Sequence, residues 1–324
     1  MTLEKAVKPV IIGISDTKLT DREKALLHEH SPLGIALFAR NIKADEKGKQ
    51  NKEALAQLIT DIKEILGENS IIAIDQEGGR VQRLTKPTFY NAPPAKGFGD
   101  LAKDQGLEIA IEKCKQNYSN IGKELKAFGI NLDFAPVGDI SHKGAHDVIG
   151  NRSFGVEPEI VVPLCIAALE GLQQEKVQGC IKHLPGHGRA KADSHKELLK
   201  VSNSLEKLEK TDFKVFKELS SFDQVKLAMT AHIVYECIDP DNPATLSPKV
   251  IKYIRNEIGY KGLIISDAIE MKALNGDMKD IAKKALEAGV DIVLECTGKL
   301  ENMIEVLDSV SKISINKFAN LLLN

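Results

Sequence analysis

The sequence has no tryptophan, and aromatic residues make up only 5% of its 324 residues. Flat rings that could stack along a polymer are few, so a sugar ligand would be short and held largely by hydrogen bonds. The 44 Lys and Arg residues nearly balance the 46 Asp and Glu residues, and no segment of the chain is strongly basic. Nucleic acid is therefore not an expected partner, because its phosphates require a positively charged surface. No apolar run approaches the about 18 residues that cross a bilayer, and no membrane association is expected.

Cysteine is also scarce, and its five positions include no CxxC pair. This spacing argues against a disulfide framework and against a zinc site, and it predicts reduced thiols. The apolar run at residues 9–14 is too short for the h-region of a signal peptide and lacks a small-residue cleavage pattern. We therefore expect a cytoplasmic protein without a metal or another cofactor, and the sequence specifies no oligomeric state.

Eight short apolar runs rich in β-branched residues recur along the chain, and stretches with helical spacing separate most of them. The runs are residues 9–14, 34–39, 70–75, 130–135, 177–183, 225–232, 262–267 and 291–295. The predicted helices span residues 52–66, 106–128, 159–175, 205–220, 247–258 and 280–288. Eight such strand–helix units predict a closed (β/α)8 TIM-type barrel, with a doubly wound open sheet as the alternative. Because no Pro-, Gly- or Ser-rich linker divides the chain, residues 1–324 are predicted to form a single α/β domain.

Polar residues stand at the ends of many predicted strands. They are Asp75, Asp133, Lys182, His183, His232, Asp267 and Glu295. Barrel enzymes place their chemistry at the carboxyl ends of the strands, so these side chains are expected to converge on a site for a polar ligand. The alternative is that they cap the following helices, and for Asp133 and Glu295 that interpretation is at least as good.

The segment CIKHLPGHGRAKADSHKELL, from Cys180 to Leu199, holds three of the eight histidines. In an extended backbone the side chains of Asp193 and His195 share one face, because they are two residues apart. The carboxylate would then orient the imidazole and raise its pKa from about 6.5, so that the ring could donate and retrieve a proton near neutrality. On spacing alone, Asp193 or Ser194 is equally well interpreted as the N-cap of a short helix.

Asp267 ends the apolar run GLIISD, which predicts a carboxylate at a partly dry barrel mouth. A nucleophile suits that position, since retaining glycosidases attack the anomeric carbon with a carboxylate while a second group protonates the leaving oxygen. A histidine is the candidate for the second group. The alternative role for Asp267 is to cap a helix over residues 268–273.

The stretch DQEGGRVQRL begins with Asp75 and contains two glycines that would let the backbone approach a ligand, followed by Arg80 and Arg83. A carboxylate acceptor opposite guanidinium donors is suited to binding sugar hydroxyls. The glycine pair alone is only a weak signal for a phosphate loop. In IGNRSFG, Arg152 could reach a hydroxyl or an acetamide carbonyl, and its alternative is a solvated surface position.

Six motifs occur in the order DQEGGRVQR, NLDFAPVGDI, GNRSFG, KHLPGHGRAKADSH, MTAHIVY and GLIISDAIEM. Together they resemble the β-N-acetylhexosaminidases of glycoside hydrolase family three, and most of all its single-domain bacterial members that recycle cell-wall muropeptides. The resemblance extends from about residue 31 to the last predicted strand. It implies a hydrolase that removes a terminal β-linked N-acetylglucosamine from 1,6-anhydro-N-acetylmuramic acid, with or without its peptide.

By this resemblance Asp267 is the nucleophile, His195 is the acid/base on a mobile loop, and Asp193 orients that histidine. The residues implied to bind the N-acetylglucosamine are Asp75, Arg83, Arg152, Lys182 and His183. Family members with a second domain often take an acid/base glutamate from outside the barrel, and the chain is too short after its eighth predicted strand to hold that domain. Two residues depart from the family pattern: Leu184 replaces a common Phe, and Ala268 replaces a frequent second Asp. We expect the first to alter only packing and the second to leave one unambiguous nucleophile.

Three other functions compete with this interpretation. A metal-dependent barrel hydrolase would use His183, His187, His195, His232 and Asp267 as ligands, but the Lys182 ammonium would be repelled and no HxH or HExxH pair is present. A phosphorylase on the same scaffold would bind phosphate with Arg80 or Lys182. A non-catalytic sugar-binding protein would keep Asp75, Arg152 and Lys182 without needing the catalytic residues.

Overall fold

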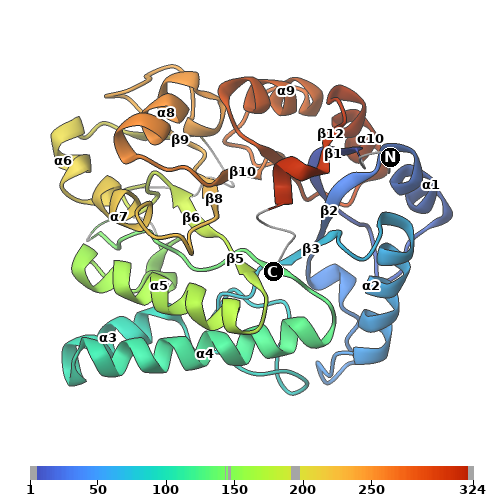
Figure 1. Ribbon diagram of the computed structural model, residues 1–324, viewed down its shortest axis with the longest axis horizontal. Coiled ribbons are helices and arrows are strands. Elements are labelled where there is room, and N and C mark those ends of the chain that lie inside the picture. Colours follow the sequence, from blue (N-terminus) through green and yellow to red (C-terminus); the bar gives the residue numbers. More distant parts are fainter. Residues whose placement is uncertain (1–5, 143, 145–146, 191–197, 320–324) are drawn as a thin grey trace.

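The computed structural model describes residues 6–142, 144, 147–190 and 198–319. Within these residues, parallel strands form a ring that the chain follows in order (Figure 1). The strands are β1 (Ala6–Gly13), β2 (Pro32–Leu37), β3 (Ile71–Ile74), β4 (Leu132–Asp133), β5 (Gln178–Gly179), β6 (Ile181–Leu184), β8 (Leu227–Thr230), β10 (Leu263–Ala268) and β11 (Ile292–Glu295). β5 pairs with β4, β6 pairs with β8, and only Cys180 separates β5 from β6, so the ring closes. The predicted (β/α)8 barrel is confirmed, and all eight predicted strands lie in it.

The strands are apolar throughout because both of their faces are buried. Along β1, Val10 and Ile12 belong to the cluster beneath the helices, whereas Ile11 belongs to the cluster that fills the barrel. Successive side chains of a strand point to opposite faces, and here both faces are buried, so neither face requires polar residues. This explains the continuous apolar runs in the sequence.

Helices surround the ring in Figure 1. They are α1 (Asp21–His30), α2 (Lys52–Leu66), α3 (Ala95–Gln105), α4 (Leu107–Ala127), α5 (Pro158–Gln174), α6 (Leu205–Glu209), α7 (Asp212–Leu219), α8 (Pro248–Tyr253), α9 (Met278–Ala288) and α10 (Leu300–Ser309). Short helical turns are η1 (Ala39–Asn41), η2 (Gly150–Arg152), η3 (Ala244–Leu246), the π-helical η4 (Ile254–Ile258) and η5 (Ile315–Phe318). Outside the ring, β7 (Leu199–Val201) pairs with β9 (Ile233–Tyr235), and β12 (Ile313–Ser314) pairs antiparallel with β1. In the part of the chain that the structure describes, no helix has the length and apolar character needed to cross a membrane.

Most predicted helix positions agree with the structure, with two informative differences. The single helix predicted at residues 205–220 is divided into α6 and α7, because Thr211 has a non-helical backbone and its hydroxyl donates to the Lys207 carbonyl. Helices α1, α3 and α10 were not predicted. For α1 the signal was present, since Thr20 and Glu23 form a capping box in which each side chain accepts the other's backbone N–H.

Helix α3 supports the loop that carries Arg152. Its Gly99 lies directly against the backbone of Phe154, and a Cβ at position 99 would overlap the Phe154 carbonyl oxygen. Gly97, in the same helix, has open space around the place of its Cβ. The close approach at Gly99 therefore sets where the Arg152 loop lies.

We predict that Gly99→Ala lowers the free energy of unfolding by about 2–3 kcal/mol, because the added methyl group forces α3 away from a fixed backbone. Urea denaturation measures this loss. Gly97→Ala is the matched control and should leave stability unchanged or slightly raised, since alanine favours the helix without a clash. Equal stability of the two variants would show that α3 does not hold this loop in place.

Candidate active site

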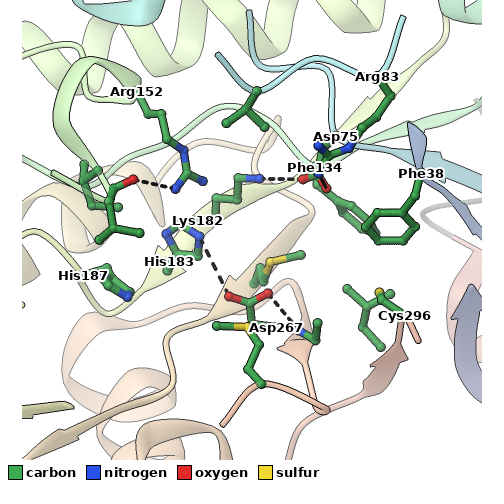
Figure 2. Close-up of a pocket in the computed structure, with 17 residues that line it drawn as sticks. Phe38, Asp75, Arg83, Phe134, Arg152, Lys182, His183, His187, Asp267 and Cys296 are labelled. Carbon is green, nitrogen blue, oxygen red and sulfur yellow. Dashed lines mark hydrogen bonds and ion pairs between the residues drawn. The ribbon is translucent and has the colours of Figure 1, made fainter. Parts of the chain in front are cut away.

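A small pocket of about 180 Å³ opens where the strands end at their carboxyl side (Figure 2). Its polar lining consists of Asp75, Arg83, Arg152, Lys182, His183, His187 and Asp267. The floor contains Phe134, Met229 and Leu294, which also belong to the packed barrel interior. The pocket is therefore blind, with charged walls and an apolar floor. Five residues predicted to bind a sugar and the predicted nucleophile all line it.

The ammonium of Lys182 lies between two carboxylates. Its Nζ is 2.9 Å from Oδ1 of Asp75 and 2.6 Å from Oε1 of Glu77, and the Lys182 side chain is only 3% exposed. Arg83 adds a second cation to Asp75, with Nη2 donating to Oδ2 at 2.9 Å. Burial alone would raise the pKa of Asp75, but Lys182 and Arg83 hold it well below its usual range. Asp75 is thus an ionised acceptor at any ordinary pH.

Glu77 belongs to the charge network of the pocket and was not predicted as a site residue. Arg152 donates to Glu77 from both Nε and Nη2 at 2.8 Å, and the Lys182 ammonium forms a second ion pair with Glu77. Burial raises the pKa of Glu77, yet the two cations outweigh that effect and lower it to about 2. The surface interpretation of Arg152 is wrong, because its guanidinium is largely buried against Glu77. The sequence did hold a signal, since Glu77 is two residues from Asp75 and shares its side of an extended chain.

Gln76 closes the loop that brings Asp75 and Arg83 together. Its side-chain amide accepts from the N–H groups of Arg83 and Leu84 and donates to the Leu84 carbonyl. The glycines of this loop, expected to let backbone approach a ligand, serve another purpose. Gly78 has φ +97° and a Cβ there would overlap the Pro93 carbonyl oxygen, so it allows the turn to pack against a neighbouring segment. The N–H groups of Glu77 and Gly79 donate to carbonyls of the chain, which argues against a phosphate loop.

His183 lies between two carboxylates, those of Asp139 and Asp267. Its Nδ1 is 2.6 Å from Oδ2 of Asp139, and its Nε2 faces Oδ2 of Asp267 at 4.0 Å. Asp139 is fully buried and also accepts from the backbone N–H of His187 at 2.6 Å. Burial would raise the pKa of Asp139, but His183 outweighs it and the pKa is lowered. The ionised Asp139 accepts a hydrogen bond from Nδ1 of His183, and this orients Nε2 of the ring toward the pocket.

Asp267 lies near the end of β10, and its side chain is 19% exposed and lines the pocket. The N–H of Ala268 donates to Oδ1 at 2.8 Å. His232 supports this backbone, because its Nε2 is 3.0 Å from the Ala268 carbonyl oxygen and its Nδ1 is 2.7 Å from the Thr245 hydroxyl. Burial raises the pKa of Asp267, but His183 and His232 reverse the effect and lower it. The capping alternative is wrong, since no helix begins before α9 in this fully described stretch.

Three of the polar strand-end residues do not line the pocket, contrary to the expected convergence. His232 lies beneath Asp267, as described above. Asp133 is fully buried, accepts from the Gln76 N–H, and has its pKa raised to about 8 by burial. Glu295 is also fully buried, accepts from Thr297, and has its pKa raised to about 7 by burial. Neither carboxyl caps a helix in the described structure, so the capping alternative for them is wrong as well.

Asp193 and His195 lie outside the described residues. Among the residues that are described, no group of three or more His, Cys, Asp or Glu side chains is arranged to hold a metal ion. His183 and His232 instead direct ring nitrogens to Asp139, Thr245 and a backbone carbonyl. Arg80, a candidate phosphate ligand, extends to Asp147 and to the carbonyls of the same loop.

Comparison with known proteins gives a consistent result. The profile of the glycosyl hydrolase family 3 N-terminal domain matches residues 3–320. A β-hexosaminidase of Neisseria gonorrhoeae is 38% identical over 291 residues, which cover 89% of this chain and 78% of that protein. A β-hexosaminidase of Bordetella avium is 35% identical over 292 residues, which cover 89% and 80%. The solved structure of NagZ from Neisseria gonorrhoeae in complex with N-trifluoroacetyl-D-glucosamine superposes with a TM-score of 0.88 at 34% identity, covering 98% of this chain and 91% of that one.

We predict that Glu77→Gln lowers the free energy of unfolding at pH 7 by about 3–5 kcal/mol, because it leaves buried cations without their partner. The pKa of Glu77 is about 2 in the folded protein against 4.5 for the free side chain. Its stabilising contribution is therefore complete above pH 4.5 and is lost as the pH falls toward 2. Urea unfolding measures this: between pH 7 and pH 2.5 the free energy of unfolding should fall less for the variant than for the wild type.

Glu159→Gln is the control for that measurement. Glu159 pairs with Lys214 on the surface, where solvent screens the charges, so its loss should leave stability unchanged. If Glu77→Gln were as harmless as Glu159→Gln, Glu77 would not be the anion that holds Lys182 and Arg152.

Proposed function

The chain belongs to glycosyl hydrolase family 3, and on that premise we propose that it is a retaining exo-β-N-acetylglucosaminidase with Asp267 as nucleophile. The observation that carries the proposal is the contrast between Asp267 and the other carboxylates of the site. Asp75 and Glu77 are each paired with two cations, whereas Asp267 faces the pocket without such a cation pair among the described residues. An ionised carboxylate that is not bound by a cation keeps its electron pair available for attack.

The environment of Asp267 suits both steps of the reaction, in which the carboxylate first attacks as the nucleophile and later departs as the leaving group. The Ala268 N–H holds Oδ1, which leaves Oδ2 toward the pocket and toward His183. The lowered pKa keeps the carboxylate ionised at neutral pH for attack on the anomeric carbon. The same stabilisation of the anion helps it leave when the glycosyl–enzyme bond breaks in the second step.

The described carboxyl groups provide no suitable proton donor, because the two with strongly raised pKa values, Asp133 and Glu295, do not line the pocket. Asp75, Glu77 and Asp139 all have lowered pKa values, so each is ionised near neutrality. A general acid must lie across the glycosidic bond from the nucleophile. We assign that role to His195, oriented by Asp193, on the resemblance of the KHLPGHGRAKADSH segment to the family's pattern, and two residues of separation allow the carboxylate and the imidazole to share a face. His195 would protonate the leaving oxygen and then remove a proton from the attacking water.

The blind pocket supports cleavage at the end of a chain. The packed floor leaves room for one terminal sugar, and the walls offer ionised acceptors and fixed donors to its hydroxyls and acetamide. Asp75, Arg83, Arg152, Lys182 and His183 are the proposed contacts. We propose N-acetylglucosaminyl-1,6-anhydro-N-acetylmuramic acid, with or without its peptide, as the substrate, and a place in cell-wall recycling for the reaction.

The test is hydrolysis of two aryl β-N-acetylglucosaminides, one with a good and one with a poor leaving group, with EDTA present throughout. Asp267→Asn should lower kcat on both by at least about a thousandfold, because the nucleophile is lost. His195→Ala should lower kcat/KM by about 10²–10⁴ on the poor leaving group and far less on the good one, which needs no proton. Retention of β configuration in the first product, followed by NMR, checks the two-step route.

Each remaining outcome would replace the proposal. Wild-type turnover that disappears in EDTA and returns with a divalent ion would make this a metal-dependent hydrolase. Turnover that requires phosphate and forms a sugar phosphate would make it a phosphorylase. Binding of N-acetylglucosamine without any turnover would make it a sugar-binding protein. Comparing the anhydro disaccharide with chitobiose as substrates tests the proposed aglycone, and equal kcat/KM for the two would reject it.

A further inference from the structure

The guanidinium groups of two arginines lie over the ring of Phe38 in the pocket wall. The Arg40 Cζ is 4.8 Å from the centre of the Phe38 ring and the Arg83 Cζ is 5.4 Å from that centre. Both distances are within the range of cation–π attraction. Phe38 directly follows β2 and lines the same pocket as Asp75 and Arg83 (Figure 2). Phe38 therefore lies against one of the proposed sugar-binding residues, Arg83, without carrying a polar group itself.

Arg83 needs an additional restraint. It is bound to Asp75 through Nη2 alone, and its buried Nε has no hydrogen-bond partner among the described residues. A guanidinium held at one nitrogen can turn about that bond. Arg152 differs, because it binds Glu77 through two nitrogens and the Val148 carbonyl through the third. Of these two pocket arginines, only Arg83 depends on something other than hydrogen bonds for its orientation.

The ring of Phe38 is itself held firmly. Arg40 donates from Nε to the Ile14 carbonyl and from Nη2 to the Cys296 carbonyl, so its guanidinium is fixed across the ends of β1 and β11. The backbone of Phe38 is also fixed, since its N–H donates to Oδ1 of the buried Asn41 and its carbonyl accepts from the Asn41 N–H. The ring is thus a fixed surface that contacts one well-anchored guanidinium, that of Arg40, and one that is hydrogen-bonded through a single nitrogen, that of Arg83.

We propose that Phe38 is a positioning residue for substrate binding, which orients Arg83 so that the Asp75–Arg83 pair meets the sugar hydroxyls. The inference rests on the proposed function, because it assigns the step in which Phe38 acts. Arg40 stabilises the ring, the ring attracts the Arg83 guanidinium, and Asp75 accepts from its Nη2. Phe38 makes its contribution through Arg83 and not through contact with the reacting atoms.

A double-mutant cycle in kcat/KM for an aryl β-N-acetylglucosaminide tests this proposal. Phe38→Leu should lower kcat/KM about tenfold, mainly through KM, because Arg83 loses its orientation. Phe38→Tyr should keep most of the wild-type value, since it keeps the ring. Arg83→Met should cause the larger loss, and the double variant should be no worse than Arg83→Met within about twofold. If the loss in kcat/KM of the double variant equalled the product of the two single-variant losses, the proposal would be overturned, because Phe38 would then act independently of Arg83.

Phe89→Leu is the matched control for a lost aromatic ring. Phe89 is buried, lies 5.2 Å from the Lys52 ammonium and packs on Phe128, but it does not line the pocket. This variant should change stability and leave KM unaltered. If Phe38→Leu behaved in the same way, the role of Phe38 would be structural only and the proposal would be wrong.

A second measurement does not depend on turnover. The chain has seven arginines, so selective ¹⁵N labelling gives a simple spectrum of side-chain Nε–H groups. Arg83→Met identifies the Arg83 signal by its loss. Phe38→Leu should shift that signal and alter its relaxation while the Arg152 signal stays in place. An unchanged Arg83 signal would reject the inference even if the enzyme proved to have another activity, whereas absent turnover with a shifted signal would reject only the proposed function.

Discussion

The buried ammonium of Lys182 is the constraint on which the rest of the site depends. A charge in so dry a place is tolerated only when it is paired and hydrogen-bonded, and its partners are Asp75 and Glu77 from the loop after β3. Glu77 in turn binds Arg152 from η2, and Asp75 binds Arg83. One buried cation on β6 therefore joins three segments that are far apart in the sequence into a single rigid wall.

Charge divides the carboxylates of the pocket into two groups. On the wall around Lys182 the carboxylates are neutralised by cations, so they serve as fixed hydrogen-bonding groups. On the opposite side Asp267 faces His183, whose other nitrogen is bound to Asp139. Imidazole contacts lower the pKa of Asp267 without forming the close ion pairs that occupy Asp75. The same residue type thus stands in two electrostatic environments, which its neighbours decide.

Much of the fold and part of the site could be predicted from the sequence. Strands covered on both faces leave continuous apolar runs, and a polar residue after such a run marks the catalytic end of a barrel strand, as with Asp75 and Asp267. Glu77, Asp139 and Gln76 escaped prediction because their importance lies in contacts across the fold. Nothing near Asp139 in the sequence indicates that it binds His183, which is 44 residues later. The division of one predicted helix at Thr211 was also invisible, since a side-chain bond to a nearby carbonyl competes there with helical spacing.

The sequence by itself determined the alternation of strands and helices, the closed barrel, the family and the residue types of the pocket, because periodicity and motifs are local properties of a chain. Only the tertiary structure decided which of the strand-end residues face the ligand. His232, Asp133 and Glu295 follow the same pattern as Asp267 yet are buried away from the pocket. It also decided which pocket carboxylate has no close ammonium or guanidinium partner among the described residues, and which pocket arginine lies over the Phe38 ring. Burial and pairing set these properties, and both depend on neighbours that only folding brings together.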